Sequence, residues 1–342
     1  MLKKLFPLLA CIIVLNLIPC LVSAAAPFYE GKTIRIIVGY SPGGGYDAYS
    51  RLIARHLGKH IPGNPTVIVE NMPGAGSLIA ANHLYKVAKP DGLTIANFNG
   101  GHFFGQVFGQ AGIEFDARKF EFIGAPGRDD PAFVLTKASG ITSIEKWMAS
   151  KTPVKLGGTA PGTHTPNNAI RIVETALGLP IQLVSGYKGT AEIRLAAESG
   201  ELAGSAWWWE SIKATWRKGI DAGEIIPVLQ AVPKPLPDIP MVPLAINLAK
   251  TEEARQLIEV GIHSGSVVAR PYVLSPGIPK DRVEILRKAF QETLKDKECI
   301  AEGEKAKLVF APVTAEELEK VVNGLFKLDS ALISKLKEIT SK

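Results

Sequence analysis

The groups in this chain best suited to chemistry are backbone amides in glycine-rich turns rather than reactive side chains. One such turn is the segment 41–47, Ser-Pro-Gly-Gly-Gly-Tyr-Asp, which follows an apolar run and precedes a segment of helical period. A turn of this kind presents N–H groups at the positive end of a helix dipole, where an anion binds without a charged side chain. We therefore predict one half of an anion site at Ser41, Gly43, Gly44, Gly45 and Asp47.

Two further turns of the same kind occur in the second half of the chain. The segment 157–164, Gly-Gly-Thr-Ala-Pro-Gly-Thr-His, and the segment 186–190, Gly-Tyr-Lys-Gly-Thr, each lie between a predicted strand and a predicted helix. In open α/β sheets, ligands bind beyond the carboxyl ends of the strands, where such turns gather. The opposing half of the predicted site consists of Gly158, Thr159, Gly162, Thr163, His164 and Tyr187.

The same turns do not have the spacing of a nucleotide site. The run 43–45 lacks the G-x-G-x-x-G spacing, and the segment 74–79 has Ile79 where the third glycine belongs.

For an enzyme acting on carboxylates, His102 and His164 are the only acid–base candidates. We therefore predict no catalytic residue and no cofactor.

The histidines and cysteines give no metal site. His56 and His60 have i, i+4 spacing, but the pair falls at a predicted helix end, where imidazole suits the helix dipole. Cys299 lies in Lys-Asp-Lys-Glu-Cys, far from any glycine turn. No metal ligand is assigned.

Three consecutive tryptophans, 207–209, end a predicted strand. Alternate residues of a strand face opposite sides, so Trp207 and Trp209 share one face and Trp208 takes the other. The pair either packs in the core or forms a flat wall against the apolar body of a ligand. We include Trp207 and Trp209 among the candidate ligand-binding residues, and both interpretations stay open.

The N-terminus has the pattern of an export signal. Lys3 and Lys4 precede an apolar stretch over 5–22 and a cluster of small residues, which predicts a signal peptide over 1–24 and a periplasmic protein. Its removal lowers the formal net charge from +6 to +4 and leaves Cys299 as the only cysteine, so no intrachain disulfide is expected. The remaining basic residues are scattered, so we expect no nucleic-acid partner.

Strand-length apolar runs alternate with helix-period segments in both halves of the chain. This order predicts a largely parallel sheet with helices on both faces. We expect an α/β fold of two lobes, each a mixed, mostly parallel sheet flanked by helices. The first lobe is assigned to 25–127 and 245–342, and an inserted second lobe to 128–244.

Several segments resemble the substrate-binding proteins of tripartite tricarboxylate transporters, the Bug family. They are Lys-Thr-Ile-Arg-Ile-Ile-Val at 32–38, Pro42-Gly43-Gly44 with Asp47, Val-Glu-Asn-Met-Pro-Gly-Ala-Gly at 69–76, Lys-Pro-Asp-Gly-Leu-Thr at 89–94, Tyr187-Lys188-Gly189 and Leu-Pro-Asp-Ile-Pro at 236–240. The resemblance implies a type II-like periplasmic binding fold of two lobes, with a cleft that closes on a carboxylate. It also implies a membrane permease as partner. The chain departs from the family pattern in the tryptophan triplet, in Gly44-Gly45-Tyr46, and in having no acidic residue at the customary position within Glu-Leu-Ala-Gly-Ser at 201–205.

The sequence therefore predicts a periplasmic receptor, not an enzyme, that captures a small organic carboxylate and delivers it to a tripartite-type permease. The alternative is an extracytoplasmic sensor that uses the same cleft and signals to a membrane kinase. We expect a monomer. The pattern does not distinguish a di- or tricarboxylate from an amino acid or an aromatic acid.

Overall fold

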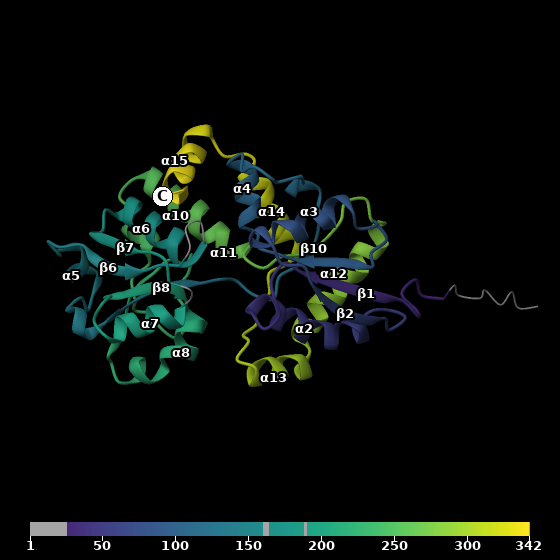
Figure 1. The fold of residues 1–342 in the computed structure, drawn as a ribbon, viewed down its shortest axis with the longest axis horizontal. Helices are drawn as coiled ribbons and strands as arrows, with labels where there is room; N and C mark the ends of the chain where they lie inside the picture. Colours follow the sequence, from purple (N-terminus) through teal and green to yellow (C-terminus); the bar gives the residue numbers. More distant parts are fainter. Residues whose placement is uncertain (1–25, 160–163, 188–189, 342) are drawn as a thin grey trace, which may run out of the picture.

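The chain folds into two lobes joined by crossing segments (Figure 1). This computed structural model describes residues 26–159, 164–187 and 190–341. The predicted signal peptide, 1–24, therefore lies outside the described residues. Among the described residues, no helix is both long and apolar enough to cross a bilayer.

The first lobe is built on a five-stranded sheet of order β2-β1-β3-β10-β4. Four strands run in one direction, because β1 pairs in parallel with β2 and β3, whereas β10 is antiparallel to both of its neighbours. Isoleucine and valine dominate β1, and four of its six residues are buried. The strands are β1 (Thr33–Val38), β2 (Thr66–Asn71), β3 (Thr94–Asn97), β4 (Glu121–Gly124) and β10 (Tyr272–Leu274).

The second lobe repeats this arrangement with the strand order β7-β6-β8-β5-β9. Here β5 is the antiparallel strand, and it lies between β8 and β9. The predicted two-lobe α/β fold with mixed, mostly parallel sheets is thus confirmed. The strands are β5 (Pro131–Thr136), β6 (Val154–Gly157), β7 (Ile181–Val184), β8 (Gly204–Trp208) and β9 (Ile225–Gln230).

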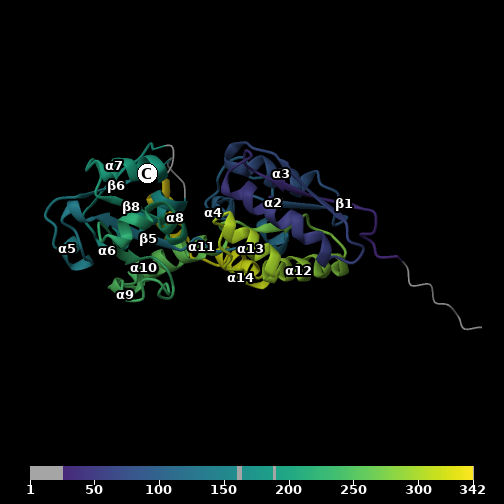
Figure 2. The ribbon, with the colours of Figure 1, turned by 90° about the horizontal axis from the view of Figure 1, so that it is seen from below.

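Each antiparallel strand directly follows a passage of the chain between the lobes. The chain leaves the first sheet at the end of β4, and β5 begins at Pro131. It returns through η6 (Glu259–Ser264) and α11 (Gly265–Val267), which lead into β10, and Figure 2 shows α11 between the two lobes. The turns predicted to bind an anion lie at the carboxyl ends of parallel strands, after β1 in the first lobe and after β6 and β7 in the second.

Helices of amphipathic pattern cover the first sheet. In α12, the periodic residues Val283, Leu286, Phe290 and Leu294 are all buried, as their spacing predicts. The helices are α2 (Gly45–Leu57), η1 (Gly58–His60), η2 (Ala75–Ser77), α3 (Leu78–Lys86), α4 (Gly101–Val107), η3 (Ala117–Lys119), α12 (Lys280–Lys295), α13 (Lys297–Lys305) and α14 (Ala315–Leu325).

The helices of the second lobe include segments that the sequence assigned to the first. Residues of α9, α10 and α15 belong to the same hydrophobic cluster as β6 and α6, because Leu257, Ile258, Leu336 and Ile339 pack there. Figure 1 shows α15 on the second lobe, beyond α14 on the first. The helices are η4 (Lys137–Ser139), α5 (Ile144–Met148), η5 (His164–Asn168), α6 (Ala169–Leu177), α7 (Thr190–Glu198), α8 (Trp209–Asp221), α9 (Ala245–Leu248), α10 (Glu252–Ile258) and α15 (Ser330–Ser341).

Candidate functional site

The first predicted turn leads into the N-terminus of α2, which no side chain caps. The helix begins at Gly45, and its N-cap residue, Gly44, forms no side-chain capping hydrogen bond. The first N–H groups of a helix have no acceptor within the helix. Ser41, Gly43, Gly44 and Gly45 are exposed, so this end of the helix is open to an anion.

Asp47 anchors this turn from inside and is not a surface group. Its side chain is 3% exposed. Oδ2 accepts hydrogen bonds from the Gly43 amide at 2.8 Å and from Arg51 Nε at 2.9 Å, and Oδ1 accepts one from Asn71 Nδ2 at 2.9 Å. Burial raises the pKa of the Asp47 carboxyl, but the hydrogen bonds from Arg51, Gly43 and Asn71 outweigh it, and the net shift is downward. Asp47 and the Gly43 amide therefore shape the turn, in which Gly44 and Gly45 are exposed.

The segment 39–43, Gly-Tyr-Ser-Pro-Gly, has the G-x-S-x-G spacing of serine hydrolases, a match that the sequence reading missed. A nucleophilic serine needs a histidine base within hydrogen-bonding reach. Among the described residues, the hydrogen-bonded histidines pair elsewhere: His102 with Gly76 and Ser77, His56 with Glu302 and His60 with Asp296. The pentad therefore lacks a partner for Ser41 among these contacts.

The turn between β2 and α3 has a constrained backbone beside the first one. Ala75 and Ser77 have positive φ angles of 46° and 80°, which non-glycine residues adopt at a cost. The Gly76 carbonyl accepts hydrogen bonds from Tyr40 Oη at 3.3 Å and His102 Nε2 at 2.8 Å. Side chains that follow β1 and begin α4 thus hold this turn in place.

In the second lobe, a buried amide anchors the predicted turns. Asn167 is 1% exposed, and its Oδ1 accepts a hydrogen bond from the Thr159 amide at 2.7 Å. Its Nδ2 donates to the Thr159 carbonyl at 3.3 Å and to Ser185 Oγ at 3.0 Å, so one side chain joins the ends of β6 and β7. The Gly158 carbonyl accepts from the Tyr187 amide at 3.2 Å, which brings the two turns together.

Of the other residues predicted in this half, His164 begins η5, and Gly162 and Thr163 lie outside the described residues. The Tyr187 hydroxyl donates to Glu201 Oε1 at 2.6 Å, so its proton is engaged within the second lobe and not offered to a ligand. That hydrogen bond raises the pKa of Tyr187 to about 12. Glu201, the first residue after Gly200, is thus the partner of Tyr187.

Trp207 and Trp209 lie in the core of the second lobe and not in the cleft, which corrects their place among the site candidates. They are 2% and 3% exposed. Trp207 packs on Trp216 with ring centroids 5.2 Å apart, and Trp209 Nε1 donates to Asp238 Oδ2 at 3.0 Å. The face of β8 that carries Trp207 is covered by α7 and α8, whose apolar residues belong to the same cluster.

The half-buried member of the triplet is Trp208, which lies against a residue of the returning crossing segment. The Arg270 guanidinium carbon is 3.7 Å from the Trp208 ring centroid, and Arg270 Nη1 donates to Asp129 Oδ1 at 2.7 Å. Burial raises the pKa of the Asp129 carboxyl to about 7, against the opposing effect of Arg270. Asp129 belongs to the segment between β4 and β5, and Arg270 to the segment before β10, so their ion pair joins these two crossings. The contact with Trp208 connects them to the second lobe.

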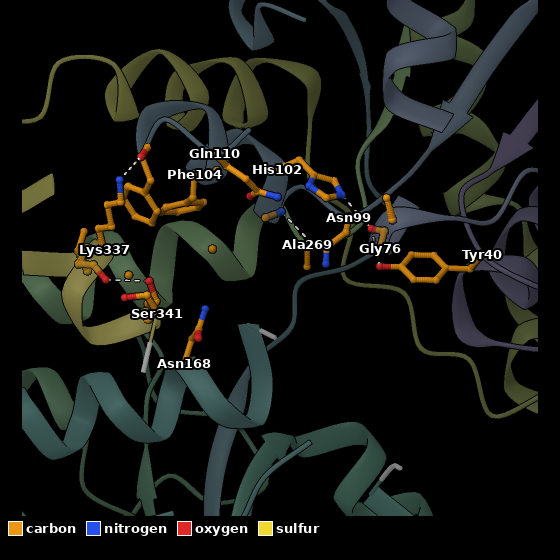
Figure 3. A pocket seen from close by; sticks show the side chains of 18 residues that line it. Tyr40, Gly76, Asn99, His102, Phe104, Gln110, Asn168, Ala269, Lys337 and Ser341 are labelled. Atoms are coloured by element: carbon orange, nitrogen blue, oxygen red, sulfur yellow. Dashed lines mark hydrogen bonds between the residues drawn. The ribbon is translucent and has the colours of Figure 1, made fainter. Parts of the chain in front are cut away.

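Between the lobes lies a cavity of about 550 Å³, within the usual size range of small-molecule sites. Figure 3 shows Tyr40, Asn99 and His102 of the first lobe around it, with Asn168 and Lys337 on the other side. Lys337 is the one charged side chain, other than a histidine, among the described lining residues, and none of them is acidic. Burial lowers the pKa of His102. The lining therefore favours an anionic or neutral ligand over a cation. The lining consists of Tyr40, Ala75, Gly76, Asn99, Gly101, His102, Phe104, Gly105, Phe108, Gln110, Asn168, Gly261, Gly265, Ala269, Leu336, Lys337, Thr340 and Ser341.

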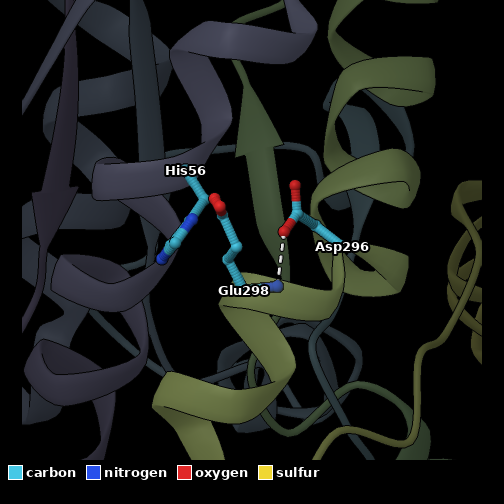
Figure 4. Close-up of side chains that lie close together, drawn as sticks. All are labelled: His56, Asp296 and Glu298. Atoms are coloured by element: carbon cyan, nitrogen blue, oxygen red, sulfur yellow. Dashed lines mark hydrogen bonds between the residues drawn. The ribbon is translucent and has the colours of Figure 1, made fainter.

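A second cluster, between α2 and α13, has metal-ligating residue types. His56, Asp296 and Glu298 offer ligand atoms that lie within 4.8 Å of one another (Figure 4). However, Lys59 Nζ lies 2.7 Å from Asp296 Oδ2 and 2.7 Å from Glu298 Oε2. The hydrogen bond from Lys59 lowers the pKa of the Asp296 carboxyl. An ammonium group thus already balances the two carboxylates, and we interpret the cluster as an ion-pair contact between the helices.

Comparisons with known structures show that the chain has the fold of two-lobe solute-binding proteins. The fold matches a TctC solute-binding protein from Polaromonas over 90% of this chain and 99% of that one, with a TM-score of 0.70 and 20% identity. It also matches the periplasmic binding protein BugD over 92% and 99% of the two chains (TM-score 0.60, 18% identity). A third match is MatC from Rhodopseudomonas palustris with bound malate, over 90% and 99% (TM-score 0.59, 17% identity). The predicted resemblance to the Bug family is thereby confirmed in the fold.

The sequence comparisons are more limited. A UPF0065 protein of Bordetella pertussis is 29% identical over 204 residues, which are 58% of this chain and 61% of that protein. A UPF0065 protein of Cupriavidus necator is 42% identical over 73 residues, or 21% of each chain. The matches thus span about three fifths and one fifth of these relatives. No protein-family model matches the chain.

Proposed function

We propose that this chain is a periplasmic receptor that captures a small organic carboxylate between its lobes and delivers it to a tripartite-type membrane permease. The uncapped N-terminus of α2 carries the proposal, because it offers backbone donors and a positive dipole end. Residues 41–47 are not among the lining residues, but Tyr46 in the first turn of α2 packs on Tyr40 of the lining, with ring centroids 4.4 Å apart. The absence of an acidic side chain from the described lining supports an anionic ligand. The malate reported in the neighbour MatC is of the same chemical class.

The lobes provide a way to trap the ligand. The cavity is lined by residues of both lobes and of the crossing segment, including Gly76, Asn168 and Ala269. A ligand that contacts both lobes stabilises whichever arrangement provides more of these contacts. The closed arrangement would then be the form that a permease recognises.

The test is a Gly44→Val variant titrated by calorimetry with the carboxylate that gives the largest thermal shift in a panel of di- and tricarboxylates, amino acids and aromatic acids. Gly44 has an ordinary φ of −83°, and a Cβ there meets nothing within 4 Å, so the fold should be preserved. The valine side chain would stand at the helix N-terminus. Each charge-assisted hydrogen bond contributes about 1.5–3 kcal/mol, so we expect an affinity loss of at least about tenfold.

The matched control is Gly324→Val, because a Cβ at Gly324 also meets nothing within 4 Å and the residue lies on α14, away from the cavity. It should bind as the unmodified protein does. If no member of the panel binds to ligand-free protein, or if Gly44→Val binds with unchanged affinity, the proposed carboxylate site is wrong.

A further inference from the structure

The interlobe cavity has two chemically different ends. Tyr40 and Gly76 lie at one end, near the turns that follow β1 and β2 (Figure 3). At the other end Figure 3 shows Phe104 and Lys337, and Phe108 and Leu336 belong to the same lining. A carboxylate held near the turns would therefore have its remaining atoms directed toward an apolar wall.

Two phenylalanines make up most of this apolar wall. Phe104 and Phe108 are four residues apart, so they lie on one side of α4 and its C-terminal cap, with ring centroids 6.2 Å apart. Both are half-buried, whereas their neighbour Phe103 is fully buried in the core of the first lobe. Apolar surface on a concave wall commonly marks a binding site, since covering it removes it from water.

The C-terminal helix closes this end of the cavity. Leu332, Leu336 and Ile339 fix α15 in the core of the second lobe. Across the gap, Lys337 Nζ donates to the Phe108 carbonyl of the first lobe at 2.8 Å. The acceptor is a neutral carbonyl, so this contact does not cancel the positive charge of Lys337. The wall is therefore apolar in surface and positive at its rim, which suits an anion with an apolar body.

We propose that the ligand is a carboxylate whose body is an aromatic ring or an alkyl chain, and that this body packs on Phe104 and Phe108. This inference rests on the proposed carboxylate-binding function. A compact hydroxy acid such as malate or citrate would place hydroxyl or carboxylate groups against the two rings. Polar groups buried without hydrogen-bond partners are costly, so such ligands are disfavoured here.

The test compares phenylacetate and hexanoate with malate and citrate by calorimetry on ligand-free protein. We expect the two apolar-bodied acids to bind at least about tenfold more tightly than the two compact acids. A Phe104→Ala variant should lose at least about tenfold in affinity for phenylacetate, because the ring contact is lost. Its affinity for any compact acid that binds measurably should stay within about twofold.

The matched control is Phe326→Ala, since Phe326 is also half-buried but lies under Arg118 outside the cavity lining. It should bind phenylacetate as the unmodified protein does. Tighter binding of malate or citrate, or unchanged phenylacetate binding in Phe104→Ala, would overturn the inference while leaving the carboxylate receptor intact. Failure of all four acids to bind, together with the rest of the panel, would instead remove the proposed function.

Discussion

The two lobes use different side chains to anchor the turns that the sequence predicts to bind an anion. In the first lobe the anchor is a carboxylate, Asp47, and in the second it is a neutral amide, Asn167. Both are almost fully buried, at 3% and 1% exposure, and each is hydrogen-bonded to the backbone of the turn it holds. A charged side chain therefore fixes the turn in the first lobe, and a neutral side chain fixes the turn in the second.

The difference follows from what surrounds each anchor. Asp47 lies in the first turn of α2, where the helix dipole favours a negative charge, and it forms an ion pair with Arg51 at 2.9 Å. The partners of Asn167 include the Thr159 carbonyl and the Ser185 hydroxyl, and the carbonyl requires a donor. An amide can donate and accept at once, which an ionised carboxylate cannot. A buried charge is tolerated only where a counter-charge and donors meet it.

The largest effect is expected from Asn167→Asp, which places a carboxylate in the neutral setting. The aspartate would lose the hydrogen bond to the Thr159 carbonyl and would bring an uncompensated charge into a fully buried position. We expect the free energy of unfolding to fall by about 3 kcal/mol, measured by denaturant titration at pH 7. Binding of the carboxylate ligand should weaken as well, since the turn holding Thr159 loosens. A loss below about 0.5 kcal/mol would show that the two anchors are interchangeable.

The sequence predicts the turns but not their anchors. Glycine spacing and strand periodicity are local properties, and the apolar runs at 154–157 and 225–230 form the strands β6 and β9. Asn167 joins Thr159 to Ser185, and these partners come together only through the pairing of β6 with β7. No local pattern distinguishes such an asparagine from a surface one.

The aromatic and apolar residues also show that local patterns do not predict which faces pack together. Alternation along β8 separates Trp207 from Trp208, but the strand ends there and Trp209 begins α8 instead of continuing it. Which face of β8 is covered depends on where α7 and α8 pack. Likewise, the amphipathic pattern of α15 predicts a buried stripe at Leu332, Leu336 and Ile339, and not the lobe that receives it. The meeting of Phe104 and Phe108 with Leu336 and Lys337 of α15 therefore depends on how the lobes pack and not on a local pattern.

A second test compares the lobes by their response to acid. His263 lies in η6, next to Ile262 in the core of the second lobe, and burial lowers its pKa to about 4. In the unfolded chain the pKa of histidine is about 6.5, so the unfolded state binds the proton first as the pH falls. The contribution of neutral His263 to the free energy of unfolding is complete above about pH 6.5 and is lost as the pH falls toward 4. Between these limits the free energy of unfolding falls by about 1.4 kcal/mol per pH unit, which amounts to a loss of about 2 kcal/mol at pH 5.

The measurement is the free energy of unfolding at pH 7 and pH 5 for the unmodified protein and for His263→Gln. The variant should show a smaller loss between the two pH values, because glutamine does not titrate. Burial also lowers the pKa of His102 in the first lobe, so part of the acid sensitivity should remain in the variant. Equal pH dependence in the two proteins would exclude His263 as a source of the second lobe's acid sensitivity.

The smallest effect is expected from Asp47→Asn, which removes the charge from the first anchor. Asparagine keeps an acceptor for the Gly43 amide, and the lost ion pair with Arg51 is worth little because the Arg51 side chain is 43% exposed. We expect the free energy of unfolding at pH 7 to fall by about 1 kcal/mol, less than for Asn167→Asp. The lowered pKa of Asp47 means that its contribution to stability is present above about pH 4 and is lost below it, so the variant and the unmodified protein should converge in stability at lower pH.

Removing a negative charge beside the helix N-terminus should leave carboxylate binding equal or stronger. Weaker binding would mean that Asp47 contacts the ligand, and that the first lobe's anchor and its binding group are the same residue.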